Sequence, residues 1–274
     1  MVSCKDYVEI RKKELKGKIG KYKADGSKVP SLCVIQVGDN PASNSYIKGK
    51  LKDCSDIGVD VDHIKLEENT NNIELKTTIR ECSLGSKYNG IIVQLPLPSH
   101  IDVEEVTDCI PATKDVDGFR RDSYFDPCTP KGIVDWLDYN KYDVTGKDVV
   151  VVGRSKIVGK PLVNMLIDKG ATVTCCNSKT VFIEQYLHNA DLVVSAIGKP
   201  KYFDGLSFRD TDIIVDVGIN RDENGKLCGD IDRESVERIF EDTYVTPVPG
   251  GVGLLTRLAL LENVVKAYEM QNRI

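Results

Sequence analysis

The sequence predicts an α/β fold with two domains, of which the second is a Rossmann-type domain built on a parallel sheet. From residue 147 onward, apolar runs rich in β-branched residues alternate with segments of helical pattern, which is typical of βαβ units. The first half contains the same two kinds of segment in a less regular order. A chain of 274 residues is long enough for two ordinary domains and a sizeable core.

In the first half we expect a helix, a strand, a second helix and a second strand. Residues 5–22 carry apolar side chains on one helical face, and "SLCVIQVG" (31–38) reads as a strand. Pro41 suits the first turn of the next helix and Gly58 its end. The run "GIIVQLPLP" (90–98) predicts a buried strand that its prolines end. Periodicity is lost over 118–130, where we place the domain boundary.

In the second half, apolar runs predict strands and the segments between them predict helices. The expected strands are "KDVVVVG" (147–153), "ATVTCC" (171–176), "DLVVSAIG" (191–198) and "DIIVDVG" (212–218). The expected helices are "KPLVNMLIDKG" (160–170) and "FIEQYLHN" (182–189), with a last helix over 254–271.

The composition argues against several classes of protein. Hydrophobic residues make up 41% and charged residues 29%, which is normal for a soluble globular protein. The net charge of −5 argues against a nucleic-acid partner. No apolar run approaches the roughly 20 residues that span a bilayer, and the charged first residues lack the apolar core of a signal peptide. We therefore expect a cytoplasmic protein without a membrane partner.

The cysteines and histidines do not suggest a metal site. The nine cysteines include no C-x-x-C pair, and the three histidines stand apart from one another. Reduced thiols are therefore expected. Asp115 and Asp117 form a D-x-D pair without further ligands, so we expect no metal. With so few histidines, proton transfer is expected to fall to Lys, Asp, Glu or Tyr.

Gly153 marks a candidate dinucleotide site. It stands where the first strand of the second half turns into its helix, a position at which backbone N–H groups and a helix N-terminus face a bound dinucleotide. The next glycine, Gly159, is six positions on, whereas the usual fingerprint has closer glycines. An ordinary tight turn is therefore the alternative interpretation.

The end of the second strand favours NADP over NAD. In NAD-binding domains this strand end normally carries an acid for the ribose 2′-hydroxyl. Here it carries Asn177, Ser178 and Lys179, and Arg154 lies on the adjacent turn. An arginine and a hydroxyl without a carboxylate suit a 2′-phosphate. Turns with Gly198 and Gly218 follow later strands and are expected to line the same site.

Polar residues in unusual positions mark the first half. Tyr46 and Lys50 are four residues apart and so share a helix face. Gln94 ends an apolar strand, at the strand end where α/β folds bind ligands. Asp117 lies in a loop before a glycine, and "TPVPGGVG" (246–253) is too long for one turn. Taken singly, these features also suit a solvated helix face, a loop cap, and an interdomain linker.

Together the motifs are more specific. The segments "VGDNPASNSYIKGK", "VQLPLPSHI", "KDVDGF", "PCTPKG", "GRSKIVGKP" and "PVPGGVG" occur in an order that resembles the bifunctional methylenetetrahydrofolate dehydrogenase/methenyltetrahydrofolate cyclohydrolase family, over residues 30–265. The resemblance implies NADP-dependent oxidation of 5,10-methylenetetrahydrofolate to the methenyl cation, and its hydrolysis to 10-formyltetrahydrofolate. It also implies a folate-binding catalytic domain over 1–125, completed by 251–274, an NADP domain over 126–250, a cleft between them, and dimers formed through the NADP domains.

The resemblance also implies roles for individual residues. Lys50 would be the catalytic lysine, Tyr46 would pack on the folate ring, and Gln94 would hydrogen-bond near Lys50. Asp117 would bind the pterin through its row of N–H donors. The other substrate contacts would come from Leu95, Pro96, Gly250, Gly251 and Val252. The NADP contacts would come from Gly153, Arg154, Ser155, Asn177, Ser178, Ala196, Gly198 and Ile219.

The chemistry of the two reactions agrees with these roles. Hydride loss leaves a delocalised cation, so that step needs positioning more than acid or base. Hydrolysis needs a water and proton transfers, for which a partly desolvated lysine is suited. The closing motif usually continues "GGVGPMT" in the family, whereas Leu254 and Leu255 stand here. Two alternatives are an NADP dehydrogenase of the shikimate type and a non-catalytic NADP-binding regulator.

Overall fold

The computed structural model describes residues 1–273, with only the backbone at Ala42, and divides them into two compact units. Unit 1 consists of Met1–Glu9 and Thr129–Thr256, and unit 2 consists of Ile10–Cys128 together with 257–273. The first helix, α1 (Cys4–Ala24), and the last, α9 (Val252–Asn272), each contribute to both units. Each unit has its own sheet and core.

Unit 2 is built on a three-stranded parallel sheet. Its order is β2-β1-β3, so the first strand lies in the middle. Side chains on both faces of β1 are buried, which explains why its sequence is almost uninterruptedly apolar. The strands are β1 (Ser31–Val37), β2 (Asp60–Leu66) and β3 (Gly90–Val93).

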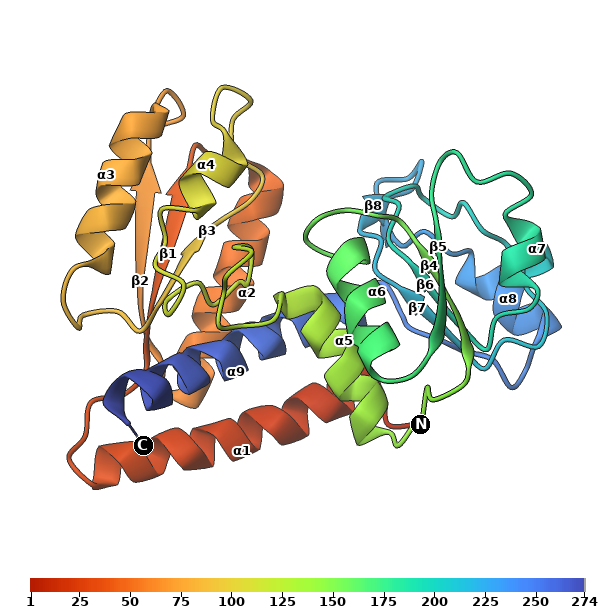
Figure 1. Cartoon of the computed structure of the whole chain (residues 1–274), viewed down its shortest axis with the longest axis horizontal. Coiled ribbons are helices and arrows are strands. Elements are labelled where there is room, and N and C mark those ends of the chain that lie inside the picture. Colours follow the sequence, from red (N-terminus) through yellow and green to blue (C-terminus); the bar gives the residue numbers. More distant parts are fainter. Residues whose placement is uncertain (274) are drawn as a thin grey trace. The chain divides into compact units, whose positions relative to one another are not determined.

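Helices cover both faces of this sheet. Figure 1 shows α3 on one side of the strands and α2 on the other. On the α3 side, Ile35 of β1 and Val93 of β3 share a core cluster with Leu75 and Ile79 of the helix. Asn71 caps α3, since its side chain accepts hydrogen bonds from the N–H groups of the first turn. The helices are α2 (Pro41–Ile57), α3 (Asn72–Ser83) and the short α4 (Val103–Thr107).

The parts of α1 and α9 that belong to unit 2 pack side by side. The rings of Tyr22 and Tyr268 lie 5.1 Å apart, and Arg11 of α1 forms an ion pair of 3.0 Å with Glu262 of α9. Leu15 is buried, as expected from the apolar face of this helix. Two segments more than 240 residues apart in sequence thus close the same unit.

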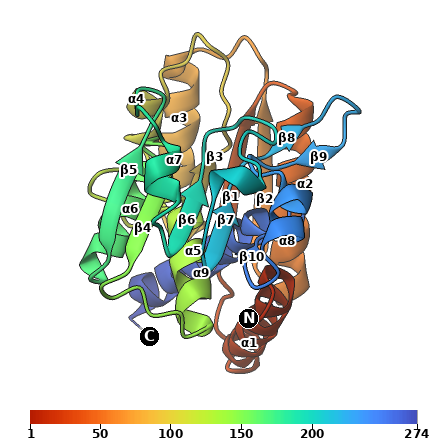
Figure 2. The same cartoon turned by 90° about the vertical axis from the view of Figure 1, so that its right-hand side faces the viewer.

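Unit 1 is built on a five-stranded parallel sheet in the order β10-β7-β6-β4-β5 (Figure 2). The four strands expected from the apolar runs are all present, and a short fifth strand extends the sheet. The doubly wound order places the first strand of the series, β4, beside both β5 and β6. The strands are β4 (Asp148–Val152), β5 (Thr172–Cys176), β6 (Leu192–Ser195), β7 (Ile213–Asp216) and β10 (Tyr244–Val245).

Helices again cover both faces of the unit 1 sheet. Figure 1 shows α5 and α6 on one side and α7 and α8 on the other. Leu187 of α7 and Val236 of α8 join a core cluster with Val150, Val193 and Ile214 of the strands. The elements are α5 (Cys128–Tyr139), α6 (Gly159–Asp168), α7 (Glu184–Leu187), the 3₁₀-helix η1 (Gly205–Ser207), α8 (Arg233–Ile239), and a hairpin of β8 (Asn220–Arg221) and β9 (Leu227–Cys228).

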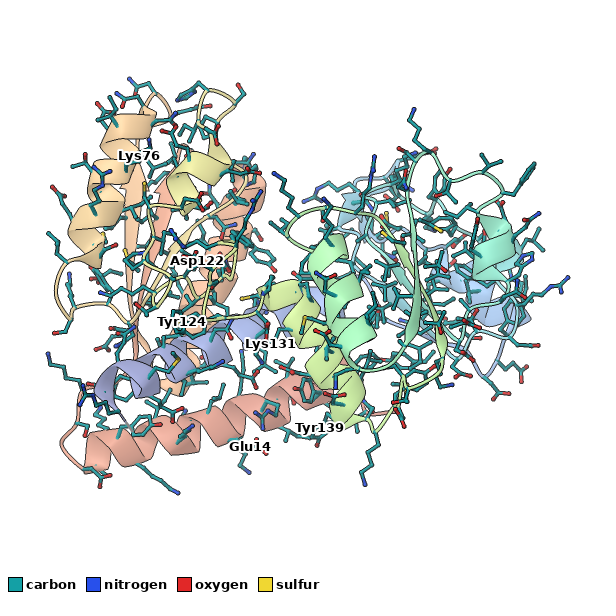
Figure 3. The ribbon with its side chains drawn as sticks, viewed as in Figure 1. Glu14, Lys76, Asp122, Tyr124, Lys131 and Tyr139 are labelled. Atoms are coloured by element: carbon teal, nitrogen blue, oxygen red, sulfur yellow. The ribbon has the colours of Figure 1, made fainter. Side chains whose placement is uncertain are left out.

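The first residues of the chain group with unit 1, although residues 1–125 were expected to lie in the first domain. The indole N–H of Trp136 donates to the carbonyl oxygen of Val2 at 3.0 Å, and the N–H of Val2 donates to Asn140 at 2.6 Å. The rings of Tyr7 and Tyr139 lie 4.8 Å apart, and Figure 3 labels Tyr139 on α5. These contacts attach the start of α1 to α5.

Two further expectations have a definite outcome. The segment "FIEQYLHN" forms only the single turn α7, because Phe182 has a φ of 52° and interrupts the helical backbone ahead of it. All nine cysteines are free thiols, as expected.

None of the helices in residues 1–273 has the length and apolar character needed to span a bilayer. In the same part of the chain, no three His, Cys, Asp or Glu side chains gather as a metal group would require.

Candidate active site

Lys50 occupies a core position of its helix. The buried stripe of α2 repeats at intervals of three and four residues, through Ser43, Ile47, Lys50, Cys54 and Ile57. Only 5% of Lys50 is exposed. Within residues 1–273 its ammonium group has no recorded hydrogen bond or ion pair. A buried amine without an acid partner is unusual and marks a functional position.

Tyr46 lies one turn before Lys50 on α2. The Nζ of Lys50 is 5.5 Å from the centre of the Tyr46 ring, within the range of a cation–π interaction. The structure therefore brings together the two residues that the spacing placed on one helix face. The ring is half-buried, so one part of it contacts the protein and another part is accessible.

Gln94 follows β3 directly and is held in line with the sheet. Its backbone N–H donates to the carbonyl oxygen of Ile35 at 2.8 Å, and its side-chain Nε2 donates to that of Leu95 at 2.6 Å. The Oε1 atom is buried and has no hydrogen-bond partner among the described residues. An unpaired buried oxygen costs about 1–3 kcal/mol, so this atom is suited to accept a hydrogen from a ligand or a water. No hydrogen bond links Gln94 to Lys50 in the described chain.

The two acids of the D-x-D pair have different surroundings. The backbone of Asp115 forms an isolated parallel β-bridge with Ile91 of β3, and its carboxylate accepts a hydrogen bond from the N–H of Arg120 at 2.9 Å. Burial raises the pKa of Asp115, and its hydrogen bonds oppose that change. Asp117 lies in the turn closed by the N–H of Gly118 and is 8% exposed. Its carboxylate has no recorded hydrogen bond within residues 1–273, so Asp115 holds the loop and Asp117 is available to a ligand.

The remaining expected substrate contacts fall in two places. Leu95 and Pro96 follow Gln94 in unit 2, the first half-buried and the second exposed. Gly250, Gly251 and Val252 belong to unit 1. A Cβ at Gly251 would lie 2.4 Å from the carbonyl oxygen of Pro247, so the backbone folds closely on itself there.

Ser43 is a polar residue of the stripe that the sequence interpretation missed. Its Oγ is buried and has no hydrogen-bond partner in the described part of the chain. It lies three residues before Tyr46 and seven before Lys50, and this spacing is the signal that would have revealed it.

The turn after β4 has the close backbone packing of a dinucleotide site. Gly153 has a φ of 121°, and a Cβ there would lie 2.5 Å from the carbonyl oxygen of Ala196. A Cβ at Gly159 would lie 2.1 Å from the carbonyl oxygen of Gly153. Ser155 accepts hydrogen bonds on its Oγ from the N–H groups of residues 158 and 159, at 3.2 and 3.3 Å. The turn therefore presents bare backbone at the start of α6, which fits a pyrophosphate.

The residues after β5 suit the 2′-phosphate of NADP better than the ribose 2′-hydroxyl of NAD. Asn177 turns the chain, since its Oδ1 accepts the N–H of Lys179 at 3.0 Å and its own N–H donates to Thr180. Ser178 is exposed there, and Arg154 is exposed on the turn after β4. Because β4 and β5 are paired neighbours and both segments follow their ends, the hydroxyl and the guanidinium lie at one edge of the sheet. No acid follows β5 at these positions.

A buried aspartate that the sequence interpretation missed holds the later turns. Asp230 is fully buried and accepts four hydrogen bonds on its carboxylate. The donors come from the end of β6, the turn that follows it and the start of β8. They are Ser195 Oγ (3.0 Å), the N–H groups of Ile197 (2.8 Å) and Lys199 (2.9 Å), and Asn220 Nδ2 (3.0 Å). These turns carry the expected cofactor contacts Ala196, Gly198 and Ile219, of which Gly198 and Ile219 are exposed.

Asp216 supports Asp230 from β7. Its carboxylate accepts the N–H groups of Gly218, Asp230 and Ile231 at 2.9–3.0 Å. A Cβ at Gly218 would lie 2.2 Å from Asp230 Oδ1, and one at Gly229 would lie 1.8 Å from Asp216 Oδ2. Each acid thus lies against a glycine backbone. Two short motifs could have revealed these acids in the sequence. They are "DVG" (216–218) and "GD" (229–230), each of which places an acid close to a glycine at a turn.

The burial of Asp216 predicts a pH dependence of stability. Burial raises its pKa to about 6 from the ordinary 3.8, and the N–H groups of Asp230 and Ile231 limit the rise. Because the folded state holds the Asp216 proton more tightly than the unfolded state does, this proton stabilises the fold. The stabilisation is fully present below about pH 4 and is lost as the pH rises through 6. The free energy of unfolding of the wild type, relative to Asp216→Asn, should fall by about 2.5 kcal/mol between pH 4 and 7.

Trp136, the single tryptophan, reports this change. It is fully buried in α5 of unit 1, so its fluorescence during urea unfolding follows the unit that contains Asp216. The fixed energetic effect of the substitution cancels when the difference between the two proteins is compared across pH. A difference that does not change with pH would contradict the expected titration.

Comparisons with known proteins cover both units. The family model "Tetrahydrofolate dehydrogenase/cyclohydrolase, catalytic domain" matches residues 2–117, and "Tetrahydrofolate dehydrogenase/cyclohydrolase, NAD(P)-binding domain" matches residues 127–272. The bifunctional protein FolD of Acetivibrio thermocellus is 43% identical over 272 residues, which are 96% of this chain and 94% of that protein.

Solved structures agree over the whole length. The bifunctional FolD dehydrogenase/cyclohydrolase of Campylobacter jejuni superposes with a TM-score of 0.93 at 41% identity, covering 99% of this chain and 98% of that one. The Trypanosoma brucei enzyme, solved with NADP cofactor and an inhibitor, has a TM-score of 0.93 at 28% identity, covering 100% and 98%. With a catalytic-domain match on unit 2 and a cofactor-domain match on unit 1, the chain belongs to the tetrahydrofolate dehydrogenase/cyclohydrolase family.

Proposed function

We propose that Lys50, Tyr46, Gln94 and Asp117 carry out the folate chemistry of this family in unit 2. The chain is a bifunctional enzyme that oxidises 5,10-methylenetetrahydrofolate to the methenyl form with NADP and hydrolyses the product to 10-formyltetrahydrofolate. The observation that carries the proposal is the buried Lys50 amine, which has Tyr46 beside it and no recorded acid partner in the described chain.

In the proposed mechanism the residues of unit 2 bind and orient the folate. Asp117 pairs with the N–H donors of the pterin, and the Tyr46 ring packs against the folate ring. Leu95 and Pro96, which follow Gln94 directly, supply further contacts from unit 2. Bound NADP would supply the acceptor for the hydride of the bridging carbon. That step needs alignment and exclusion of water, and no protein acid.

The hydrolysis requires proton transfers that Lys50 is suited to perform. A water adds to the bridging carbon, and the Lys50 amine takes one of its protons as the new C–O bond forms. The resulting ammonium then returns that proton to N5 as the bond between N5 and the carbon breaks. The remaining hydroxyl proton passes to solvent as the C=O bond of the formyl group forms on N10. The unpaired Oε1 of Gln94 accepts a hydrogen of the water and holds it in place.

The direct test is to incubate the protein with methylenetetrahydrofolate and NADP⁺. NADPH absorbance should rise, and acidification should reveal the methenyl chromophore. Methenyltetrahydrofolate supplied alone should disappear faster than in buffer. If neither reaction exceeds the rate without protein, the proposed function is wrong.

Arg154 and Ser178 are proposed to select NADP over NAD by binding the 2′-phosphate. Arg154→Ala should lower kcat/KM for NADP about 10- to 100-fold, because a hydrogen bond to a charged group contributes about 1.5–3 kcal/mol. The same change should leave kcat/KM for NAD nearly unaltered. Arg209→Ala removes another exposed arginine of unit 1 and serves as the control. An unchanged NADP-to-NAD preference in Arg154→Ala would refute this role.

We also propose that the enzyme is a homodimer formed through unit 1. In support, apolar side chains are exposed around α7 and η1, which are linked by a 3.2 Å hydrogen bond between His188 and the carbonyl oxygen of Leu206. A surface of this kind is typical of an interaction site. The exposed side chains are Val181 (67%), Phe182 (69%), Tyr186 (43%) and Leu206 (76%). Light scattering should give twice the chain mass.

A cytoplasmic location is proposed on the basis of the thiols. Nine free cysteines are typical of a reducing compartment, since oxidising compartments favour disulfides. Cell fractionation would test it.

A further inference from the structure

The helix that carries Lys50 also carries a carboxylate one turn away. Asp53 follows Lys50 by three residues on α2, and side chains three apart are neighbours on a helix surface. Only 4% of Asp53 is exposed, so water screens its charge little. An ion pair between the two would engage the Lys50 amine with a carboxylate of the protein instead of the substrate. Yet no such pair is recorded among residues 1–273.

Two other cations hold Asp53 instead. Lys12 of α1 donates from Nζ to Oδ1, and Arg257 of α9 places its Nε 3.0 Å from Oδ2. The second contact is an ion pair without a hydrogen bond, because Oδ2 is buried and has no hydrogen-bond partner in the described chain. Asp53 therefore retains an unused acceptor that faces Arg257.

Gly49 makes room for Arg257. A Cβ at position 49 would lie 2.0 Å from Nη1 and 3.2 Å from Cζ of Arg257. The guanidinium thus lies against bare backbone, one residue before Lys50. Any side chain at this position would push the guanidinium away from its place beside Asp53.

We propose that Lys12 and Arg257 keep Asp53 away from Lys50, and so leave the Lys50 amine able to exchange protons with the folate substrate. Both are positioning residues, since they act through Asp53 and not on the substrate. The inference rests on the proposed role of Lys50 in hydrolysis. It assigns a catalytic purpose to a buried ion cluster that otherwise only joins α1, α2 and α9.

The main test removes one cation and then the acid. Arg257→Met frees Oδ2, so Asp53 should pair with Lys50 and lower kcat for methenyl hydrolysis at least about tenfold, with little change in KM for the folate. Adding Asp53→Asn should restore kcat to within about twofold of Asp53→Asn alone. If the cluster were only structural, the second substitution would add to the damage.

A second variant should also release Asp53 from Arg257, and it does so without removing a charge. Gly49→Ala should displace the guanidinium from Asp53 while strengthening the helix, since alanine favours helix more than glycine does. Hydrolysis should therefore slow although the melting temperature stays equal or rises. Asp53→Asn should again restore the rate. This variant keeps the test decisive if Arg257→Met fails to fold.

The controls separate the possible failures. Arg11→Met makes the same change on α1, but Arg11 pairs with Glu262 and with Glu14, which Figure 3 labels, so hydrolysis should stay at the wild-type rate. Wild-type hydrolysis in both Arg257→Met and Gly49→Ala, or no restoration by Asp53→Asn, overturns the inference. Wild-type hydrolysis in Lys50→Met would instead overturn the proposed function.

Discussion

Replacement of Lys50 by methionine is expected to lower the rate of methenyltetrahydrofolate hydrolysis by about 10²- to 10⁴-fold, the usual contribution of a positioned acid or base. Oxidation of the methylene substrate should fall less, because hydride transfer depends on alignment. Methionine matches the length of the lysine stem and suits the apolar stripe with Ile47 and Cys54, so the variant should fold. The decay of methenyl absorbance measures the first rate, and NADPH formation measures the second.

Lys52→Met provides the matched control. Lys52 lies two residues further along the same helix, its side chain is 71% exposed, and it pairs with Asp56 at 2.5 Å. Its loss should leave both reactions within about twofold, since exposed ion pairs contribute little. Equal rates of hydrolysis in Lys50→Met and Lys52→Met would remove Lys50 from the mechanism.

Replacement of Gly159 by alanine is expected to abolish tight NADP binding while sparing hydrolysis. The new methyl group would lie 2.1 Å from the carbonyl oxygen of Gly153 and 2.9 Å from the Cα of Arg154. Both neighbours are backbone atoms, so the whole turn must move. A shift of about 1 Å at a binding site can cost roughly 100-fold, which is the expected loss in kcat/KM for NADP. Methenyl hydrolysis, assigned to unit 2, should stay within about twofold.

Gly17→Ala is the control for this substitution. A Cβ at Gly17 of α1 meets no atom within 4 Å, so the exchange is sterically free. Calorimetric titration of both variants with NADP gives the affinity. Wild-type affinity in Gly159→Ala would show that the turn after β4 is not where the dinucleotide binds.

The local pattern was sufficient for most strands and for the helices with clear signals. The four valines of β4, the Pro41 and Gly58 limits of α2, and the β-branched runs of β6 and β7 carry their periodicity within a few residues. The exposed strand β2 lacks a continuous apolar run and was missed. The segment at 182–189 was expected to be a longer helix, and the positive φ of Phe182 could not be predicted from its residue type.

The residues that organise the sites were harder to predict. Asp230 binds partners 31 to 35 residues earlier, at Ser195, Ile197 and Lys199, and no local spacing connects them. Similarly, Asp53 meets Lys12 and Arg257, from the two ends of the chain, only because α1 and α9 pack in one unit. Hydrogen bonds and ion pairs of this kind depend on three-dimensional packing.

The amino-acid sequence by itself determined the alternation of strands and helices, the glycine turn after β4 and the shared face of Tyr46 and Lys50, because each depends on neighbours within one or two turns of the chain. Only the tertiary structure decided that Lys50 is buried without an acid, that Oε1 of Gln94 is unpaired, and that the start of α1 packs on α5. Burial and pairing depend on which distant segments meet.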